Sequence, residues 1–277
     1  MKRLLQIEYI KLWNNRSSKI LIVSYFLLLT SIALIAAIKF DIGPVKFHLA
    51  EQGIFNFPYI WHFNTFITAF FKLFLAIVIV SMMANEYSNK TIKQNLIDGL
   101  SKKEFILSKF LTVIGFALLS TLFVFVVSMV LGLIYSDYNE ISIIFSDLEF
   151  LLAFFVKLVG FFSFCLFLGI LVKRSAFALG FLILWQVFEG FSRGIMRWKF
   201  FDGDTTDAIM AFYPLNSMYN LIKEPFSRLS AVQSVANQIG EEISMDYQVH
   251  WYEMAIVLGW TAIFIYLSYS LLKKRDL

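Results

Sequence analysis

Length, composition and charge place this chain in a membrane. Its 277 residues are 59% apolar and only 16% charged, and they include 32 phenylalanines. A soluble domain carries about 25% charged residues, so this chain has too few charges to cover a globular surface. These values exclude a soluble enzyme, a disordered chain and a nucleic-acid-binding domain, despite the net charge of +4. The single Cys165 excludes a disulfide framework and a cysteine-based zinc site.

Six apolar segments are long enough to cross a bilayer. About 20 apolar residues in a helix span the hydrocarbon core, and backbone groups in lipid must bond within their own segment, which favours helices over strands. We therefore expect an all-α, polytopic protein that forms a single transmembrane domain over residues 1–277. The expected transmembrane helices are 20–38, 65–84, 110–135, 150–172, 176–191 and 254–272.

The distribution of lysine and arginine predicts the orientation of these helices. With the N-terminus inside, the inner segments hold most of the cations, including the C-terminal Lys273, Lys274 and Arg275. The outer loop 136–149 has several acids and no cation. Because cytoplasmic loops carry the excess of lysine and arginine, we expect both termini in the cytoplasm and the chain in a bacterial inner membrane.

Residues 1–19 precede the first expected span and have the pattern of an interfacial helix. Leu5, Tyr9, Leu12 and Trp13 form a narrow apolar stripe on such a helix. With cations on its other faces, this helix suits the surface of an anionic inner leaflet. The alternative is a charged flank that only sets the topology.

The cytoplasmic loop between the second and third spans, residues 85–109, predicts two helices joined by a turn. Gly99 is a natural end for the first helix, because glycine adopts the left-handed backbone of a helix C-cap at little cost. Ser101 and Glu104 form a capping box, which starts a second helix that continues into the third span. Such a rigid connection can transmit movement from a partner protein to the membrane helices. The alternative is a well-capped connection without that role.

Several polar residues of this loop occur at spacings that are known from one family. They are Glu86, Thr91, Ser101, Lys102, Glu104 and Lys109. The pattern resembles that of the permeases of type-2 ATP-binding-cassette (ABC) exporters, with Lys90 where glycine is common and Gly99 where proline is common. The six expected spans, the N-terminal helix and the large loop before the last span are also similar to that family.

The resemblance implies the permease subunit of an exporter that is driven by ATP hydrolysis in a separate subunit. Two ATPase subunits, which would hold the ATP and Mg, would dock on two permeases, either a homodimer or a pair with a related permease. The residues implied in this coupling are Glu86, Thr91, Ile92, Leu96, Ile97, Gly99, Ser101 and Glu104. Independently, the chain has no G-x-x-x-x-G-K-[ST] motif, so we expect neither enzymatic activity nor a cofactor in the chain itself.

The resemblance leaves the substrate open. Relatives handle lipids, polysaccharides, antimicrobial peptides and metal-centre assembly, and the further expected partners are membrane lipid and an accessory protein at the outer face. The alternative functions are an ATP-independent channel, a membrane-embedded assembly or scaffold protein, and an intramembrane enzyme. An enzyme would need clustered His, Asp or Glu within the spans, and only Glu189 is there.

Three charged residues lie inside the expected spans, where an isolated charge is costly and often functional. Lys72, Lys157 and Glu189 fall at a similar depth toward the outer ends of their helices. One hypothesis is that they pair across the bundle and hold an outer gate. The alternatives are that the lysines extend outward to the interface and that Glu189 pairs with Arg193 one turn later.

Residues 192–253 form the only large outer loop that the spans leave. Pro214 predicts the start of a short helix that ends before Pro225. A second helix is expected from Phe226 to a stop at Gly240. These helices would lie on the membrane, re-enter it or form an outer cap.

No metal site is expected in the outer segments. The acids from Asp202 to Asp207 lack the glycine and distal glutamate of an EF-hand loop, so they predict a solvated turn. His48, His62 and His250 lack the spacing of metal ligands.

Overall fold

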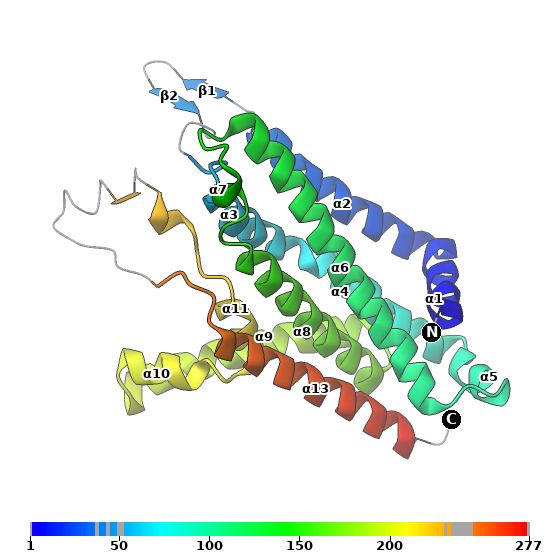
Figure 1. Cartoon of the computed structure of the whole chain (residues 1–277). Helices are drawn as coiled ribbons and strands as arrows, with labels where there is room; N and C mark the ends of the chain where they lie inside the picture. Colours follow the sequence, from blue (N-terminus) through cyan, green and yellow to red (C-terminus); the bar gives the residue numbers. More distant parts are fainter. Residues whose placement is uncertain are drawn as a thin grey trace.

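The computed structural model of the chain describes residues 2–36, 39–42, 45–48, 53–229, 232–233 and 246–275, without the side chains of residues 2 and 32–48. These residues form a bundle of long helices with a β-hairpin at one end (Figure 1). The helices are α1 (Lys2–Asn14), α2 (Arg16–Ala36), α3 (Tyr59–Thr68), α4 (Lys72–Ser88), α5 (Thr91–Ile97), α6 (Lys102–Tyr135), α7 (Ile141–Ile144), α8 (Glu149–Val172), α9 (Ser175–Ile195), α10 (Gly203–Met210), α11 (Pro214–Asn220) and α13 (Trp251–Lys274). The shorter turns are the 3₁₀ turns η2 (Ala69–Phe71) and η4 (Phe226–Arg228) and the π turn η3 (Met196–Phe200).

Five helical segments of the described residues are long and apolar enough to cross a membrane. They are Tyr59–Ser88, Lys102–Tyr135, Ile141–Val172, Ser175–Phe200 and Trp251–Lys274. Each contains one of the predicted spans from the second to the sixth, so these predictions are confirmed. The first predicted span falls on α2 as far as Ala36, and its last residues, 37 and 38, lie outside the described residues.

A short hairpin is an exception to the all-α prediction. Strands β1 (Lys39–Ile42) and β2 (Val45–His48) pair antiparallel, with Lys39 opposite His48 and Ile42 opposite Val45. The sequence carries a signal for this hairpin, because polar and apolar residues alternate on both sides of a Gly-Pro pair.

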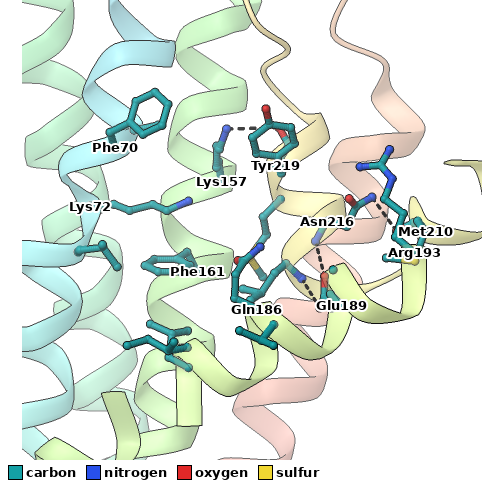
Figure 2. Close-up of a pocket in the computed structure, with 18 of the residues that line it drawn as sticks. Phe70, Lys72, Lys157, Phe161, Gln186, Glu189, Arg193, Met210, Asn216 and Tyr219 are labelled. Carbon is teal, nitrogen blue, oxygen red and sulfur yellow. Dashed lines mark hydrogen bonds between the residues drawn. The ribbon is translucent and has the colours of Figure 1, made fainter. Parts of the chain in front are cut away.

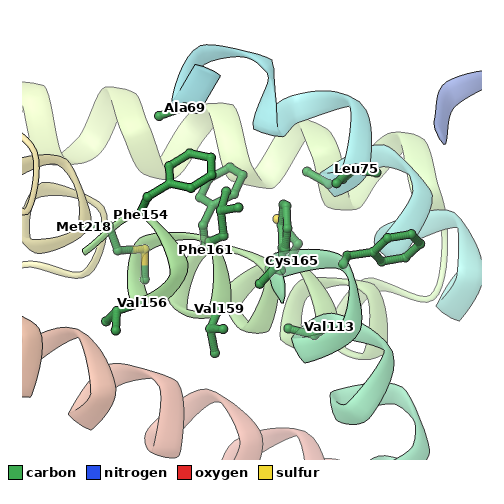
Figure 3. Packing of buried hydrophobic residues seen from close by; sticks show 14 of the residues in the cluster. Ala69, Leu75, Val113, Phe154, Val156, Val159, Phe161, Cys165 and Met218 are labelled. Atoms are coloured by element: carbon green, nitrogen blue, oxygen red, sulfur yellow. The ribbon is translucent and has the colours of Figure 1, made fainter. Parts of the chain in front are cut away.

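Helix α8 is the centre of the bundle. It packs against α4, α6, α9 and α13, and 83% of its most apolar stretch is buried. Two glycines allow this close approach. A Cβ at Gly160 would lie 2.6 Å from Val257 Cγ1 of α13, and a Cβ at Gly169 would lie 3.0 Å from Met83 Cβ of α4. Figure 3 shows how buried apolar side chains fill the space between α8 and its neighbours.

The second span begins at Tyr59 rather than at residue 65. The predicted span begins directly after the polar Asn64. In the structure, however, the Asn64 side chain is buried, and its Nδ2 donates a hydrogen bond to Ser128 Oγ of α6 at 2.9 Å. Because the amide nitrogen finds a partner inside the protein, Asn64 is accommodated within the helix, although its Oδ1 is buried without a hydrogen-bond partner among the described residues. The turn η2 then separates α3 from α4 just before Lys72.

The fifth span is longer than predicted. Helix α9 continues to Ile195 and η3 extends it to Phe200, so the outer loop begins after residue 200 rather than at 192. The prediction ended where Arg193 interrupts the apolar pattern. The Arg193 guanidinium, however, lies 2.6 Å from a carboxylate oxygen of Asp207 on α10, so its charge is paired without ending the helix.

The outer segment after α9 differs from the prediction in two places. Helix α11 begins with Pro214, as predicted. Helix α10 replaces the predicted solvated turn; Asp202 is at its N-cap position but makes no capping hydrogen bond with its side chain. The second predicted helix is wrong at its start, because the chain forms only the single turn η4 there and is extended at Leu229. At the start of this turn, the Glu224 carboxylate accepts the backbone N–H of Phe226 at 2.8 Å. Most of the remaining prediction, residues 230–231 and 234–240, lies outside the described residues.

Candidate functional site

The predicted coupling residues lie at one end of the bundle, together with α1 and both chain ends (Figure 1). We name this the inner end, after the orientation that the sequence predicts. The loop 85–109 runs here from α4 through α5 to α6, so any force on α5 acts directly on two long helices.

Backbone geometry fixes where α5 begins and ends. Lys90, just before it, has a left-handed backbone with φ of 54°, which costs a non-glycine residue about 1–2 kcal/mol. Gly99, just after it, has φ of 95°. The amide of Gly99 donates to Leu96 O at 3.2 Å and that of Leu100 to Asn95 O at 3.0 Å, which is the Schellman pattern of a glycine C-cap. The predicted helix end at Gly99 is confirmed.

The predicted capping box at the start of α6 is also confirmed. Ser101 Oγ accepts the backbone N–H of Glu104 at 3.2 Å, and Glu104 Oε2 accepts the backbone N–H of Ser101 at 2.9 Å. From there α6 continues without a break to Tyr135. Four residues separate α5 from α6, so the connection has little freedom.

A buried ion cluster holds this loop against the rest of the protein. Lys109 Nζ lies 2.7 Å from Glu8 Oε2 and 2.5 Å from Glu86 Oε1, and its side chain is fully buried. Lys11 Nζ contacts the same Glu86 oxygen at 2.9 Å. Thr91 Oγ1 donates to the other oxygen of Glu86. We name Glu8, Lys11, Glu86, Thr91 and Lys109 the Lys109 cluster, and it joins α1, α4, α5 and α6.

The sequence placed only part of this cluster. Glu86, Thr91 and Lys109 were recognised from their spacing, whereas Glu8 and Lys11 were assigned to an interfacial helix. The available signal was that Glu8 is the single acid among residues 1–16. An isolated acid on a cationic helix needs a partner when it is buried, but its partner is 101 positions away.

Helix α1 keeps three of the four residues of the predicted apolar stripe on its surface. Leu12 is buried together with Glu8, whereas Leu5, Tyr9 and Trp13 of the predicted stripe are exposed. These exposed apolar side chains remain on the surface of α1, where they fit contact with lipid.

Only some of the predicted coupling residues of α5 are exposed on its surface. Ile92 is only 2% exposed and packs into the core, so it anchors the helix and cannot touch a partner. Leu96 is half-buried against the same core. Ile97 is 75% exposed and has exposed Lys93 nearby on the same short helix. The surface open to a partner is thus one apolar side chain among polar and charged ones.

A second set of contacts ties the C-terminal segment to this end. Arg275 Nη1 donates to Tyr87 Oη and Arg275 Nη2 donates to Leu171 O, both at 3.0 Å. Lys102 Nζ donates to Arg275 O at 3.0 Å. From the sequence, Arg275 is predicted only to help set the orientation, but in the structure it joins the inner ends of α4, α6, α8 and α13.

The intramembrane charges line one cavity of about 570 Å³ between α4, α8, α9 and α11 (Figure 2). Lys72, Lys157, Glu189 and Arg193 all belong to its wall. They are therefore neighbours, as their similar depth predicted.

The expected ion pairs among these residues are not formed. Glu189 accepts the backbone N–H groups of Leu215 at 3.0 Å and Asn216 at 2.8 Å, and the Trp185 indole N–H at 2.7 Å. This carboxylate caps the start of α11, whose first amides have no acceptor within the helix. The alternative pair of Glu189 with Arg193 is also wrong, because Arg193 pairs with Asp207.

The two lysines have no carboxylate partner among the described residues. Lys157 Nζ lies 3.4 Å from Tyr219 O, a long and weak hydrogen bond. Lys72 Nζ lies 4.4 Å from the centre of the Phe161 ring, a cation–π contact.

Histidine and acidic residues show no metal geometry in the part of the chain that the structure describes. His62 is buried in α3 rather than exposed outside, and its Nε2 lies 2.9 Å from Lys223 O. Its other nitrogen lies 3.1 Å from Arg228 Nη1, so both nitrogens have protein partners.

One protein family matches nearly the whole chain. The family described as ABC-2 family transporter protein matches residues 11–277. No curated protein matches the chain.

Proposed function

The chain belongs to the ABC-2 family of transporter proteins, and on that premise we propose that it forms the membrane path of an ATP-driven exporter. As a member of this family it is a multi-pass membrane permease without a nucleotide-binding domain, and it works with a partnering ATPase subunit. The proposed complex has two permeases, as a homodimer or with a related permease, and two ATPase subunits that hold the ATP and Mg. The cargo is not identified by any residue of the chain.

The Lys109 cluster is the observation that carries the proposal. An ATPase that docks on α5 would meet Ile97, while Thr91 of the same helix is bonded to Glu86 of α4. Glu86 is bonded in turn to Lys109 of α6. Because these contacts are buried and charged, α5 cannot tilt without moving α4 and α6. ATP-driven closure of two ATPase subunits would thus reach the membrane helices.

The proposed orientation has both termini in the cytoplasm of a bacterium. Two observations support it. Lysines and arginines are concentrated in the segments at the inner end, and the exposed Leu5, Tyr9 and Trp13 of α1 suit the surface of the inner leaflet.

The test uses Ile97 and a matched control. Ile97 of α5 and Ile141 of α7 are both 75% exposed, and they lie at opposite ends of the bundle (Figure 1). The chain is co-expressed with the ABC-type ATPases of its source, and co-purification and ATPase activity are measured. Ile97→Glu should weaken association about tenfold, a typical loss for a central apolar contact of an interface, whereas Ile141→Glu should leave it unchanged.

Two outcomes would contradict the proposal. One is that no ATPase subunit associates with the wild-type chain. The other is ion conductance by the purified chain alone in a planar bilayer, which is the property of an ATP-independent channel.

A further inference from the structure

We propose that the cavity around Lys72 and Lys157 binds the phosphate headgroup of an anionic amphiphile. Lys72 comes from α4 and Lys157 from α8, and both line the cavity whose opposite side is formed by α9 and α11 (Figure 2).

The cavity wall carries two lysine side chains that no carboxylate of the described residues pairs with. Lys157 is only 3% exposed, and Lys72 lines the same cavity. Buried charges are normally paired, because an unpaired charge loses its hydration without compensation. Neither lysine has a carboxylate partner among the described residues, so an anion from outside would supply the missing charge.

The other charged residues of the wall are already occupied. Glu189 is 2% exposed and accepts three N–H donors. Arg193 is paired with Asp207. The wall groups that remain without an oppositely charged partner among the described residues are therefore the two lysine amino groups. Lysine binds phosphate as a point charge, and two lysines suit a compact group with several acceptor oxygens.

The remaining wall favours an amphiphile over a free ion. It includes apolar residues that are at least half exposed on the outside of the bundle, namely Phe70, Leu73, Ile183 and Val187. In a membrane these side chains face lipid, so the cavity is bordered by a surface along which acyl chains can lie. Its volume of about 570 Å³ is within the range of about 300–1,000 Å³ of small-molecule sites, and it accommodates a headgroup while the chains stay outside.

Binding is measured on the purified full chain in a nonionic detergent by native mass spectrometry. The probes are phosphatidic acid, phosphatidylcholine with the same acyl chains, and inorganic phosphate. We expect phosphatidic acid to bind at least tenfold more tightly than either of the others. The arm with inorganic phosphate separates an amphiphile site from a site for a free anion.

Three variants locate the site. Lys72→Met combined with Lys157→Met should weaken phosphatidic acid binding at least tenfold, which corresponds to 1.4 kcal/mol. Lys199→Met removes an exposed cation outside the cavity and should bind like the wild type. Gln186→Glu adds a carboxylate to the cavity wall, and it should weaken binding while raising the thermal stability, a combination that misfolding cannot produce.

The proposal is overturned if the double variant and Gln186→Glu bind phosphatidic acid like the wild type, or if inorganic phosphate binds as tightly as the lipid. That the bound amphiphile is the cargo rests on the proposed export function. The binding measurement needs neither an ATPase nor transport, so a failure of this site and a failure of the export function are distinguishable.

Discussion

Lys109 is the residue on which the inner end depends. Its ammonium group lies between Glu8 and Glu86, and these carboxylates would repel each other without it. This double pairing stabilises a fully buried lysine at the end of a membrane helix, because it offsets the free-energy cost of removing the charged group from water.

Removal of this cation should destabilise the protein. Lys109→Met leaves two buried carboxylates with Lys11 as the remaining partner of Glu86, and breaking a buried pair costs about 3–5 kcal/mol. The measurement is the thermal unfolding midpoint of the purified chain in detergent. Lys103→Met, at an exposed position of the same helix, should change stability by less than about 0.5 kcal/mol. Equal midpoints for the two variants would refute the structural role of the Lys109 cluster.

Helix α5 is the element that connects a partner to the membrane. Its seven residues are too few for a helix that is stable by itself. It is held by its ends: the left-handed Lys90 before it, the Gly99 cap after it, and the Thr91 hydrogen bond to Glu86. The buried Ile92 fixes one face to the core.

The cap of α5 can be tested with a pair of glycines. A Cβ at Gly99 or at Gly115 of α6 would meet no atom within 4 Å, but only Gly99 has a positive φ. Gly99→Ala should therefore cost about 1 kcal/mol through its backbone and speed trypsin cleavage in the loop 85–109. Gly115→Ala, inside a helix, should be neutral or stabilising by up to about 1 kcal/mol. If the two variants are cleaved at the same rate, the cap does not control the loop.

At the scale of the whole molecule, the inner ends of the helices form one connected body. Helix α8 contacts α4, α6, α9 and α13, and the Lys109 cluster joins α1, α4, α5 and α6 at the inner end. Arg275 adds the end of α13 through Tyr87 and Leu171. A movement of α5 is therefore expected to reach helices that have no contact with α5.

Loss of Arg275 should loosen the inner end of α13. Arg275→Ala removes charged hydrogen bonds, each worth about 1.5–3 kcal/mol, so backbone amides at the inner ends of α4 and α8 should exchange hydrogen faster. Hydrogen exchange with mass spectrometry measures this locally. Lys274→Ala removes the neighbouring exposed cation and serves as the control. Exchange that is equally slow in both variants would show that α13 is held by its apolar packing alone.

Prediction from the sequence was most successful for features that depend on residues close together in the chain. The second to sixth spans, the Gly99 end and the Ser101–Glu104 box follow from local composition and short spacings. Errors occurred where a polar residue was taken as a boundary. Asn64 and Arg193 continue their helices because Ser128 and Asp207 provide partners, and these partners are distant in the sequence.

The sequence by itself determined three properties of this protein: that it is a membrane protein, which residues form its spans, and which loop resembles a coupling loop. These properties depend on apolar length, charge count and local spacing. Only the tertiary structure decided the partners of the buried charges: Glu8 with Lys109, Glu189 with the amides of α11, and Lys72 and Lys157 with no carboxylate of the described residues. The physical reason is that a buried charge is paired by whichever helix lies beside it, and helix neighbours are set by the packing of the whole bundle.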